Sequence, residues 1–307
     1  MGKADAIIAR EFRPEELEVG LSIRNKIFSP VTSADWNRGG PFTASIAFDG
    51  DEAIGFIPLA LREFKLAPGV VITTAFENAV GAREDYRGRG VGTAMIEAAT
   101  KFLRGRAHAL FVYRGGERTK GYNFYAKNGH IDLQYVRHFS CDNSIASSHD
   151  EVTVSCGLKE ILKHQEDLFS VFEETYCAYG GFPPRHAAYW EKAFNSSIYA
   201  ARPMDLYLLK LIEKGRLTAY LILGRRRDAK AGDALRRLQA LEMGARGLDS
   251  KRMRLLLESA CSLSAKKGLE GIDVFAGDFN PFFDTLMNLN FVPSLRWLKV
   301  MSLNFDP

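Results

Sequence analysis

The chain has 307 residues, of which 46% are hydrophobic and 25% are charged, and its formal charge at pH 7 is +4. This composition is ordinary for a globular protein, and the length allows one large domain or two of average size. So small a net charge suits an anionic small molecule and does not by itself indicate a nucleic-acid partner.

The first part of the chain alternates short apolar runs with turn residues. Apolar patterns predict strands at 7–12, 42–48, 54–64, 70–82, 109–113 and 135–139. Helices are expected after Pro14, where acidic residues fill the first turn, and at 93–103 and 122–127. Residues 29–41 contain proline, tryptophan and glycine and have the composition of a loop.

The second part repeats this order after a polar stretch that begins at Asp142. Helices are expected at 158–179 and 187–194, on either side of a Gly-Pro loop at 180–184. Strands at 206–212, 217–223, 238–243, 271–275 and 298–303 follow, with helices near 253–263 and at 281–289. The repeated order predicts a duplication, with one domain at 1–141, a linker at 142–157 and a second domain at 158–307.

Other patterns exclude several classes of site. The densest basic patch, Arg225-Arg226-Arg227 with Lys230, Arg236 and Arg237, has no interleaved aromatic residues, so we expect a solvated loop and no nucleic-acid partner. The cysteines, Cys141, Cys156, Cys177 and Cys261, form no CxxC pair, which favours reduced thiols in a cytoplasmic protein. The histidines show no metal-binding spacing, and no apolar run approaches the length of a membrane span, so we expect neither a metal nor a membrane partner. Nothing in the composition indicates an oligomeric state.

The most informative stretch is residues 86–93, YRGRGVGT, between the predicted strand at 70–82 and the helix at 93–103. Its glycines allow a tight turn and close approach of a ligand to the backbone. The following helix directs unpaired N–H groups and the positive end of its dipole into that turn. This arrangement is typical of a site for a phosphate-bearing ligand.

Glycine turns of this kind have several uses, and a plain strand-to-helix turn remains one of them. A Rossmann site places its glycines early in a βαβ unit, with an acidic residue about 20 positions later. Here several strands precede the motif, and Ala107, His108 and Ala109 occupy that distance. A phosphate-binding loop of the Walker type lacks its Gly-Lys-Ser/Thr ending.

Two motifs together resemble the GNAT superfamily of acyl-CoA-dependent N-acyltransferases. The run Arg87-Gly88-Arg89-Gly90-Val91-Gly92, preceded by Tyr86, fits the family signature of Arg or Gln, two residues, Gly, one residue, and Gly or Ala. The later run at 124–130, FYAKNGH, is similar to the second family signature. The resemblance covers about residues 5–140.

The resemblance implies an α/β (α+β) fold with two GNAT-like domains, each a mixed, mostly antiparallel sheet flanked by helices. The second copy has GARGLDS at 244–250 in place of the three-glycine turn, so it should bind pyrophosphate weakly or not at all. In the first copy the co-substrate would be acetyl-CoA or another acyl-CoA. The residues implied to bind it are Val80, Gly81, Ala82, Arg87, Gly88, Arg89, Gly90, Val91, Gly92 and Thr93.

The implied reaction transfers an acyl group from the thioester to a primary amine. Tyr125 is the implied general acid for the departing thiolate, with Tyr122, three residues earlier, as a substitute. Glu77 is the candidate general base, although it falls one residue away from the family position. A β-bulge would turn it inward; without one, Asn78 would face the site, and water could relay the proton.

Two positions depart from the family pattern. Arg118 stands where the family often has an asparagine, and His130 replaces the usual phenylalanine, so we expect a hydrogen-bonded packing role for His130. The acceptor, a small molecule or a peptide amine, cannot be identified; the loops at 29–41 and 179–184 should shape its site. Trp36, Phe42 and Phe182 would then form an apolar wall or simply pack. Two alternatives remain open: an acyl-CoA-binding sensor or scaffold without turnover, and a transferase that uses longer acyl or aminoacyl donors.

Overall fold

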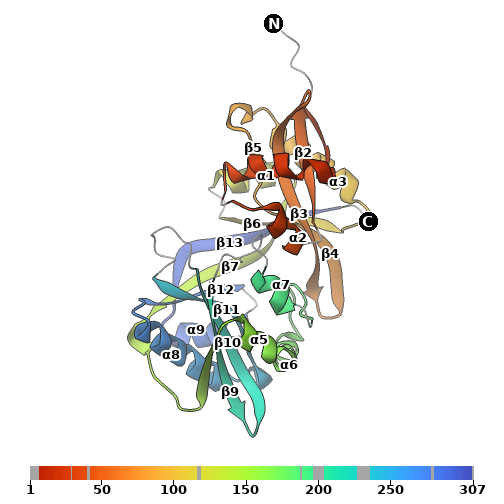
Figure 1. Cartoon of the computed structure of the whole chain (residues 1–307). Helices are drawn as coiled ribbons and strands as arrows, with labels where there is room; N and C mark the ends of the chain where they lie inside the picture. The colour runs from red at the N-terminus through yellow and green to blue at the C-terminus, as the bar shows by residue number, and fades with distance from the viewer. Residues whose placement is uncertain are drawn as a thin grey trace.

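The structure is a computed structural model, and it describes residues 7–28, 30–39, 42–115, 119–186, 189–195, 204–226, 236–277 and 280–305. The chain forms two halves that lie one above the other in Figure 1, with strands crossing between them. Both halves have the mixed, mostly antiparallel sheet with flanking helices that the resemblance implies.

The first half begins with β1 and ends with β7. Its elements are β1 (Ile8–Glu11), η1 (Pro14–Glu16), α1 (Leu17–Asn25), α2 (Ser33–Gly39), β2 (Phe42–Asp49), β3 (Glu52–Ala67), β4 (Val70–Glu77), β5 (Gly81–Ala82), η2 (Glu84–Tyr86), α3 (Val91–Leu103), β6 (Ala109–Gly115), α4 (Lys120–Lys127) and β7 (Ile131–Asp142). The single strand expected at 70–82 is two strands, β4 and β5, separated by three residues.

The expectation of a loop at 29–41 is wrong for the part that the structure describes, because this part contains α2. Thr32 and Asp35 form reciprocal hydrogen bonds at the start of the helix, with N–O distances of 3.0 and 3.2 Å. Trp36 then anchors the helix, since it is only 6% exposed and packs against aromatic rings of the sheet. This tertiary contact outweighs the loop-like local composition.

The second half repeats the order of the first. Its elements are η3 (Asn143–Ile145), β8 (Val152–Cys156), α5 (Leu158–Lys163), α6 (Gln165–Tyr176), α7 (Tyr189–Asn195), β9 (Met204–Glu213), β10 (Arg216–Arg226), β11 (Arg237–Ala245), η5 (Arg246–Leu248), α8 (Ser250–Lys266), β12 (Gly271–Gly277), α9 (Phe283–Asn288) and β13 (Val292–Asn304). The helix expected at 158–179 is broken at His164 into α5 and α6. The range expected as a linker, 142–157, contains the strand β8, which pairs with β9.

The two halves exchange their last strands. The described strands form one sheet in the order β1-β2-β3-β4-β6-β13-β7-β12-β11-β10-β9-β8, with β5 beside β3. Thus β13, the last strand of the chain, lies between β6 and β7 of the first half, while β7 lies between β12 and β13 of the second. Figure 1 shows β7 and β13 side by side at the middle of the molecule. Neither half therefore completes its own sheet.

Helix α3 covers one face of the first half of the sheet. Its buried side chains include Val91, Met95, Ile96 and Leu103, which pack into one apolar cluster with strands β2, β3, β4 and β6. Full burial of each such side chain contributes about 1.5–3 kcal/mol to folding. Gly55 of β3 allows this close packing, because a Cβ there would lie 2.7 Å from Val91 and 2.9 Å from Met95. Helix α8 packs against the corresponding strands of the second half.

A loop of the second half also binds the first half directly. The backbone of Lys65 on β3 pairs with this loop, since its N–H donates to Phe182 O at 2.9 Å and its carbonyl accepts from Gly181 N at 2.7 Å. The Lys65 ammonium donates to Tyr176 O at 3.2 Å, at the C-terminal end of α6. Gly180 allows the approach, because a Cβ there would lie 2.0 Å from Leu66 O. Among the described residues, no helix is both long enough and apolar enough to cross a membrane.

Proline at Val300 of β13 should disrupt the whole protein, because the strand is paired on both sides and Val300 is 1% exposed. We expect a loss of ~3 kcal/mol or more in the free energy of unfolding and a single unfolding transition for both halves, measured by circular dichroism in guanidinium chloride. The matched control is Val154→Pro on the edge strand β8, where Val154 is 46% exposed. Equal losses in the two variants, or separate transitions for the two halves, would contradict the shared sheet.

Candidate active site

The glycine turn of the first half leaves the start of α3 open. Gly88 and Gly90 have φ angles of +79° and +86°, which side-chain-bearing residues rarely adopt. Gly90 is the N-cap of α3 and provides no side-chain cap, and the first backbone bond of the helix is donated by Ala94 N to Gly90 O. The N–H groups of Val91, Gly92 and Thr93 therefore have no helical acceptor. No atom lies within 4 Å of the positions that a Cβ would take at Gly88 and Gly90, so there is open space beside these two glycines of the turn.

Side chains from the preceding turn hold this loop in place. Tyr86 donates its hydroxyl proton to Asp49 at 2.7 Å, and this hydrogen bond, with burial second, raises the pKa of Tyr86. Arg83 is paired with Asp85 and with Glu52, and its guanidinium lies 5.2 Å from the centre of the Tyr86 ring. The β2–β3 turn thus fixes the loop, while its N–H groups remain available to an anion.

The equivalent turn of the second half is filled by the protein's own carboxylates. Asp249 is the N-cap of α8 and accepts from Lys251 N at 2.9 Å and from Arg252 N at 3.1 Å. Glu174 of α6 accepts from Gly247 N at 3.1 Å and pairs with Arg246 at 2.6 Å. Two negative charges already occupy the positive end of this helix, which gives a physical reason to expect weak pyrophosphate binding there.

The two sequence motifs of the first half touch each other. A Cβ at Gly92, near the start of α3, would lie 2.8 Å from the ring of Phe124 on α4. The next residue, Tyr125, is 1% exposed and packs in the same apolar cluster as α3. The glycine at the end of the turn therefore allows the second motif to approach the first.

Tyr125 lies among three polar side chains. Its hydroxyl accepts a hydrogen bond from Arg114 Nη2 at 3.1 Å, and the ring of His130 lies edge-on at 4.9 Å. Burial first, and the Glu77 carboxylate second, raise the pKa of Tyr125 well above its usual value, although Arg114 acts in the opposite direction. Tyr125 is therefore protonated at neutral pH and is able to donate a proton.

A β-bulge precedes the glycine turn. Leu59 of β3 pairs with Glu77, and Phe56 of β3 pairs with Gly81. The two residues of β3 between these pairs, 57 and 58, therefore face three residues on the opposite segment, 78–80. Ala79, inside the bulge, has a φ of +60°. The bulge considered from the sequence is therefore present, and it aligns β4 and β5 along the same neighbour.

Glu77 points inward and lies beside the second motif. Its Oε1 is 3.1 Å from Nε2 of His130, and the two side chains are 1% and 0% exposed. The structure therefore brings together Glu77 and Tyr125, and His130 has the hydrogen-bonded, buried position expected for it. Asn78, the alternative residue, donates its N–H to Pro58 O at 2.9 Å. Arg118 lies outside the described residues.

Strands β4 and β6 separate next to this group. Their parallel pairing ends at Phe76 and Phe111, so Glu77 and Tyr113 lie beyond the last pair. Tyr113 stacks on Phe76 with ring centres 5.8 Å apart and remains 46% exposed. Among the groups that act on the Tyr113 hydroxyl, Tyr189 belongs to the second half. A side chain of the second half therefore lies near this opening.

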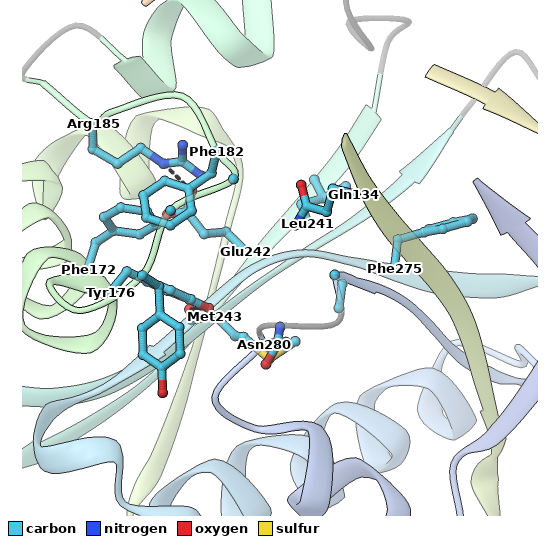
Figure 2. Close-up of a pocket in the computed structure, with 15 residues that line it drawn as sticks. Gln134, Phe172, Tyr176, Phe182, Arg185, Leu241, Glu242, Met243, Phe275 and Asn280 are labelled. Atoms are coloured by element: carbon cyan, nitrogen blue, oxygen red, sulfur yellow. Dashed lines mark hydrogen bonds and ion pairs between the residues drawn. The ribbon is translucent and has the colours of Figure 1, made fainter. Parts of the chain in front are cut away.

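Two cavities lie between the halves, close to the loop that binds β3. The first has a volume of about 160 Å³, and Figure 2 shows aromatic rings of Phe172, Tyr176 and Phe182 on one side and Phe275 on another. The second has a volume of about 260 Å³ and is lined by Phe64 of β3. Both cavities share Gln134, Tyr179, Gly180 and Gly181. The loop expected at 179–184 thus contributes residues to both cavities. Trp36, which was considered for an apolar wall of the acceptor site, packs in the core instead.

Sequence reasoning missed a buried ion pair in the first cavity. The Arg185 guanidinium binds Glu242 at 2.6 and 2.7 Å, as the dashed line in Figure 2 marks. Trp190 and Tyr220 donate to the same carboxylate at 3.0 and 2.8 Å. Burial by itself lowers the pKa of Arg185, but the attraction of the Glu242 carboxylate is larger in effect, so the pKa of Arg185 is raised. No local pattern indicates this group, because its members come from four separate elements.

The comparisons with known proteins concern the family and the fold. Residues 9–130 match the model of the acetyltransferase (GNAT) family. No curated protein matches the sequence. Among solved structures, a probable N-acyltransferase from Enterococcus faecalis is similar, with a TM-score of 0.69 and 13% identity over 98% of this chain and 72% of that one.

Two further structures resemble both halves together. A tandem GNAT protein from the clavulanic acid biosynthesis pathway has a TM-score of 0.62 and 13% identity, covering 98% of this chain and 99% of that one. The N-myristoyltransferase of Saccharomyces cerevisiae, solved with myristoyl-CoA, has a TM-score of 0.59 and 11% identity, covering 100% of this chain and 81% of that one. At these identities the likeness concerns the fold. Residues 9–130 thus match the acetyltransferase (GNAT) family model, within a chain whose fold is similar to that of a tandem GNAT protein.

Proposed function

We propose that this chain is an acyl-CoA-dependent N-acyltransferase whose active site lies in the first half, with acetyl-CoA as the donor and a primary amine as the acceptor. The observation that carries the proposal is the buried group of Tyr125 and Glu77 at the end of the β4–β6 opening, beside the uncapped start of α3. A proton donor, a carboxylate and an anion-binding helix start are the parts that acyl transfer from a CoA thioester requires.

The division of roles follows from the chemistry of each group. The N–H groups of Val91, Gly92 and Thr93 hold the pyrophosphate, and residues 80–82 guide the pantetheine arm along β5. The neutral amine attacks the thioester carbonyl, and Glu77 takes the proton that its nitrogen loses as the C–N bond forms. Tyr125 gives its proton to the departing thiolate. The raised pKa of Tyr125 supports this role, because it keeps the hydroxyl protonated until the thiolate forms.

The acceptor enters between the halves in this proposal. Tyr113, at the opening of β4 and β6, is 46% exposed, and Tyr189 of the second half influences its hydroxyl group. The two cavities beside Gln134 and the loop at 179–182 provide room for the body of an acceptor, whether a small molecule or a peptide. The second half then shapes the acceptor site.

All four cysteines are free thiols in the structure, which supports a cytoplasmic location.

Two other functions have specific support. The side chains of Tyr125 and Glu77 are buried, which favours a protein that binds acyl-CoA as a sensor or scaffold without turnover. The similarity of fold to a structure with bound myristoyl-CoA supports a transferase for longer acyl donors. Comparing acetyl-CoA with a long-chain CoA by calorimetry separates the donor lengths, and release of free CoA separates turnover from binding.

Incubation of the protein with acetyl-CoA and a panel of primary amines should release free CoA, detected with a thiol reagent. Tyr125→Phe removes the proton donor while keeping the ring, and should lower kcat about 10²-fold. Binding of acetyl-CoA, measured by calorimetry, should change little in this variant. Unchanged kcat in Tyr125→Phe would remove the acid role, and binding without CoA release from any amine would favour the sensor.

The helix start is tested by copying the arrangement of the second half into the first. Gly90→Asp places a carboxylate at the N-cap of α3, as Asp249 does for α8, and should weaken CoA binding at least about tenfold. Gly90→Asn is the matched control, because it has the same shape, tolerates a positive φ and has no charge. Calorimetric titration with CoA measures both. Equal affinities in the two variants would show that the charge at this N-cap has no effect on CoA.

A further inference from the structure

Arg114 contacts Tyr125 in a way that the proposed acid role does not use. It lies on β6, beyond the last pair with β4. Its Nη2 donates to the Tyr125 hydroxyl at 3.1 Å, and its guanidinium carbon lies 4.7 Å from the centre of the Tyr125 ring. Its Nε is buried and has no hydrogen-bond partner among the described residues. One cation is thus held against one buried hydroxyl.

This contact excludes one direction for the tyrosine proton. A guanidinium can only donate hydrogen bonds, so the Tyr125 oxygen is the acceptor and its own proton must point elsewhere. The Glu77 carboxylate also acts on Tyr125, and it has Oε1 bound to His130 and a buried Oε2 that has no partner among the described residues. The buried hydroxyl therefore has both a cation and a carboxylate among its neighbours.

We propose that Arg114 is a positioning residue for acyl transfer, which orients the Tyr125 proton and stabilises the tyrosinate after that proton has left, while Glu77 and His130 return a proton to it. This inference rests on the proposed function. The titratable groups that face Tyr125 come from three elements: Arg114 from β6, Glu77 from β4, and His130 from the residue that precedes β7.

The proton balance of the cycle is closed. The attacking amine forms a C–N bond, the C–S bond breaks, and the CoA sulfur takes the Tyr125 proton as the thiolate leaves. The tyrosinate then lies next to the positive charge of Arg114. The proton that the amine loses passes to Glu77, which is hydrogen-bonded to His130, and from Glu77 to the tyrosinate. A neutral amine thus gives an amide and a thiol, with no net change in the protein.

The charges around Tyr125 agree with this assignment. Burial and Glu77 raise the pKa of Tyr125, and Arg114 partly offsets them. Without Arg114 the hydroxyl is a weaker acid, and the tyrosinate loses the positive charge that Arg114 places beside it. Loss of Arg114 should therefore slow the step in which Tyr125 donates its proton, and should leave binding of acyl-CoA at the start of α3 unchanged.

A double-mutant cycle tests the proposal with the full chain, acetyl-CoA and an amine that the panel identifies. Arg114→Met should lower kcat about 10- to 100-fold, while KM for acetyl-CoA changes less than about twofold. In the Tyr125→Phe background the same substitution should cause no further loss, because Arg114 acts through the hydroxyl. Methylguanidinium should restore activity in Arg114→Ala and should have no effect in the variant that also carries Tyr125→Phe.

Two controls keep the result interpretable. Arg106→Met removes an arginine that forms an exposed pair with Glu11, and it should leave kcat unchanged. If Arg114→Met fails to fold, Arg114→Lys keeps the charge, and its kcat should lie between those of the wild type and Tyr125→Phe. The ¹³Cζ resonance of labelled Tyr125 should titrate at higher pH in Arg114→Met than in the wild type, which a purely structural role would not cause.

The outcomes separate the two claims. Losses of kcat that multiply in the double variant, or an unchanged Tyr125 titration, would overturn the role of Arg114 and leave the transferase intact. Absence of CoA release by the wild type with every amine would overturn the transferase and the role of Arg114 together.

Discussion

The first N–H groups of a helix have no partner within the helix, and the two halves of this chain meet this constraint in opposite ways. In the second half, Asp249 and Glu174 supply carboxylate oxygens to the N–H groups around the start of α8. In the first half, Gly90 supplies no side chain to cap the start of α3. The start of α8 is thus occupied by carboxylates, whereas the start of α3 has no side-chain cap. The function proposed here depends on this difference.

The second half is nevertheless joined to the first, because strands of both halves form one continuous sheet. β13 lies beside β6, which carries Arg114, and the loop at 179–182 pairs with β3, the neighbour of β4 and Glu77. The second half, whose helix start is filled by carboxylates, can therefore still help to hold and enclose the site proposed in the first half. The aromatic cavities at the junction are formed by both halves, which suits a role for the second half in acceptor recognition.

The sequence predicted the features that depend on local residues. The glycine turn, the motif around Tyr125 and the order of most strands and helices all follow from short patterns, and the structure contains them. The helix α2 escaped prediction because the burial of Trp36 depends on distant strands. The exchange of β7 and β13, the pairing of Arg114 with Tyr125, and the Arg185–Glu242 pair escaped for the same reason: each joins residues whose contact arises only in the folded chain.

Hydrogen exchange of backbone amides with and without CoA tests the central asymmetry most directly. CoA should slow exchange at residues 89–93, where the N–H groups at the start of α3 would bind the pyrophosphate, and should have no effect at residues 247–252 at the start of α8. Protection at 247–252, or none at 89–93, would contradict the assignment of the open helix start to the donor.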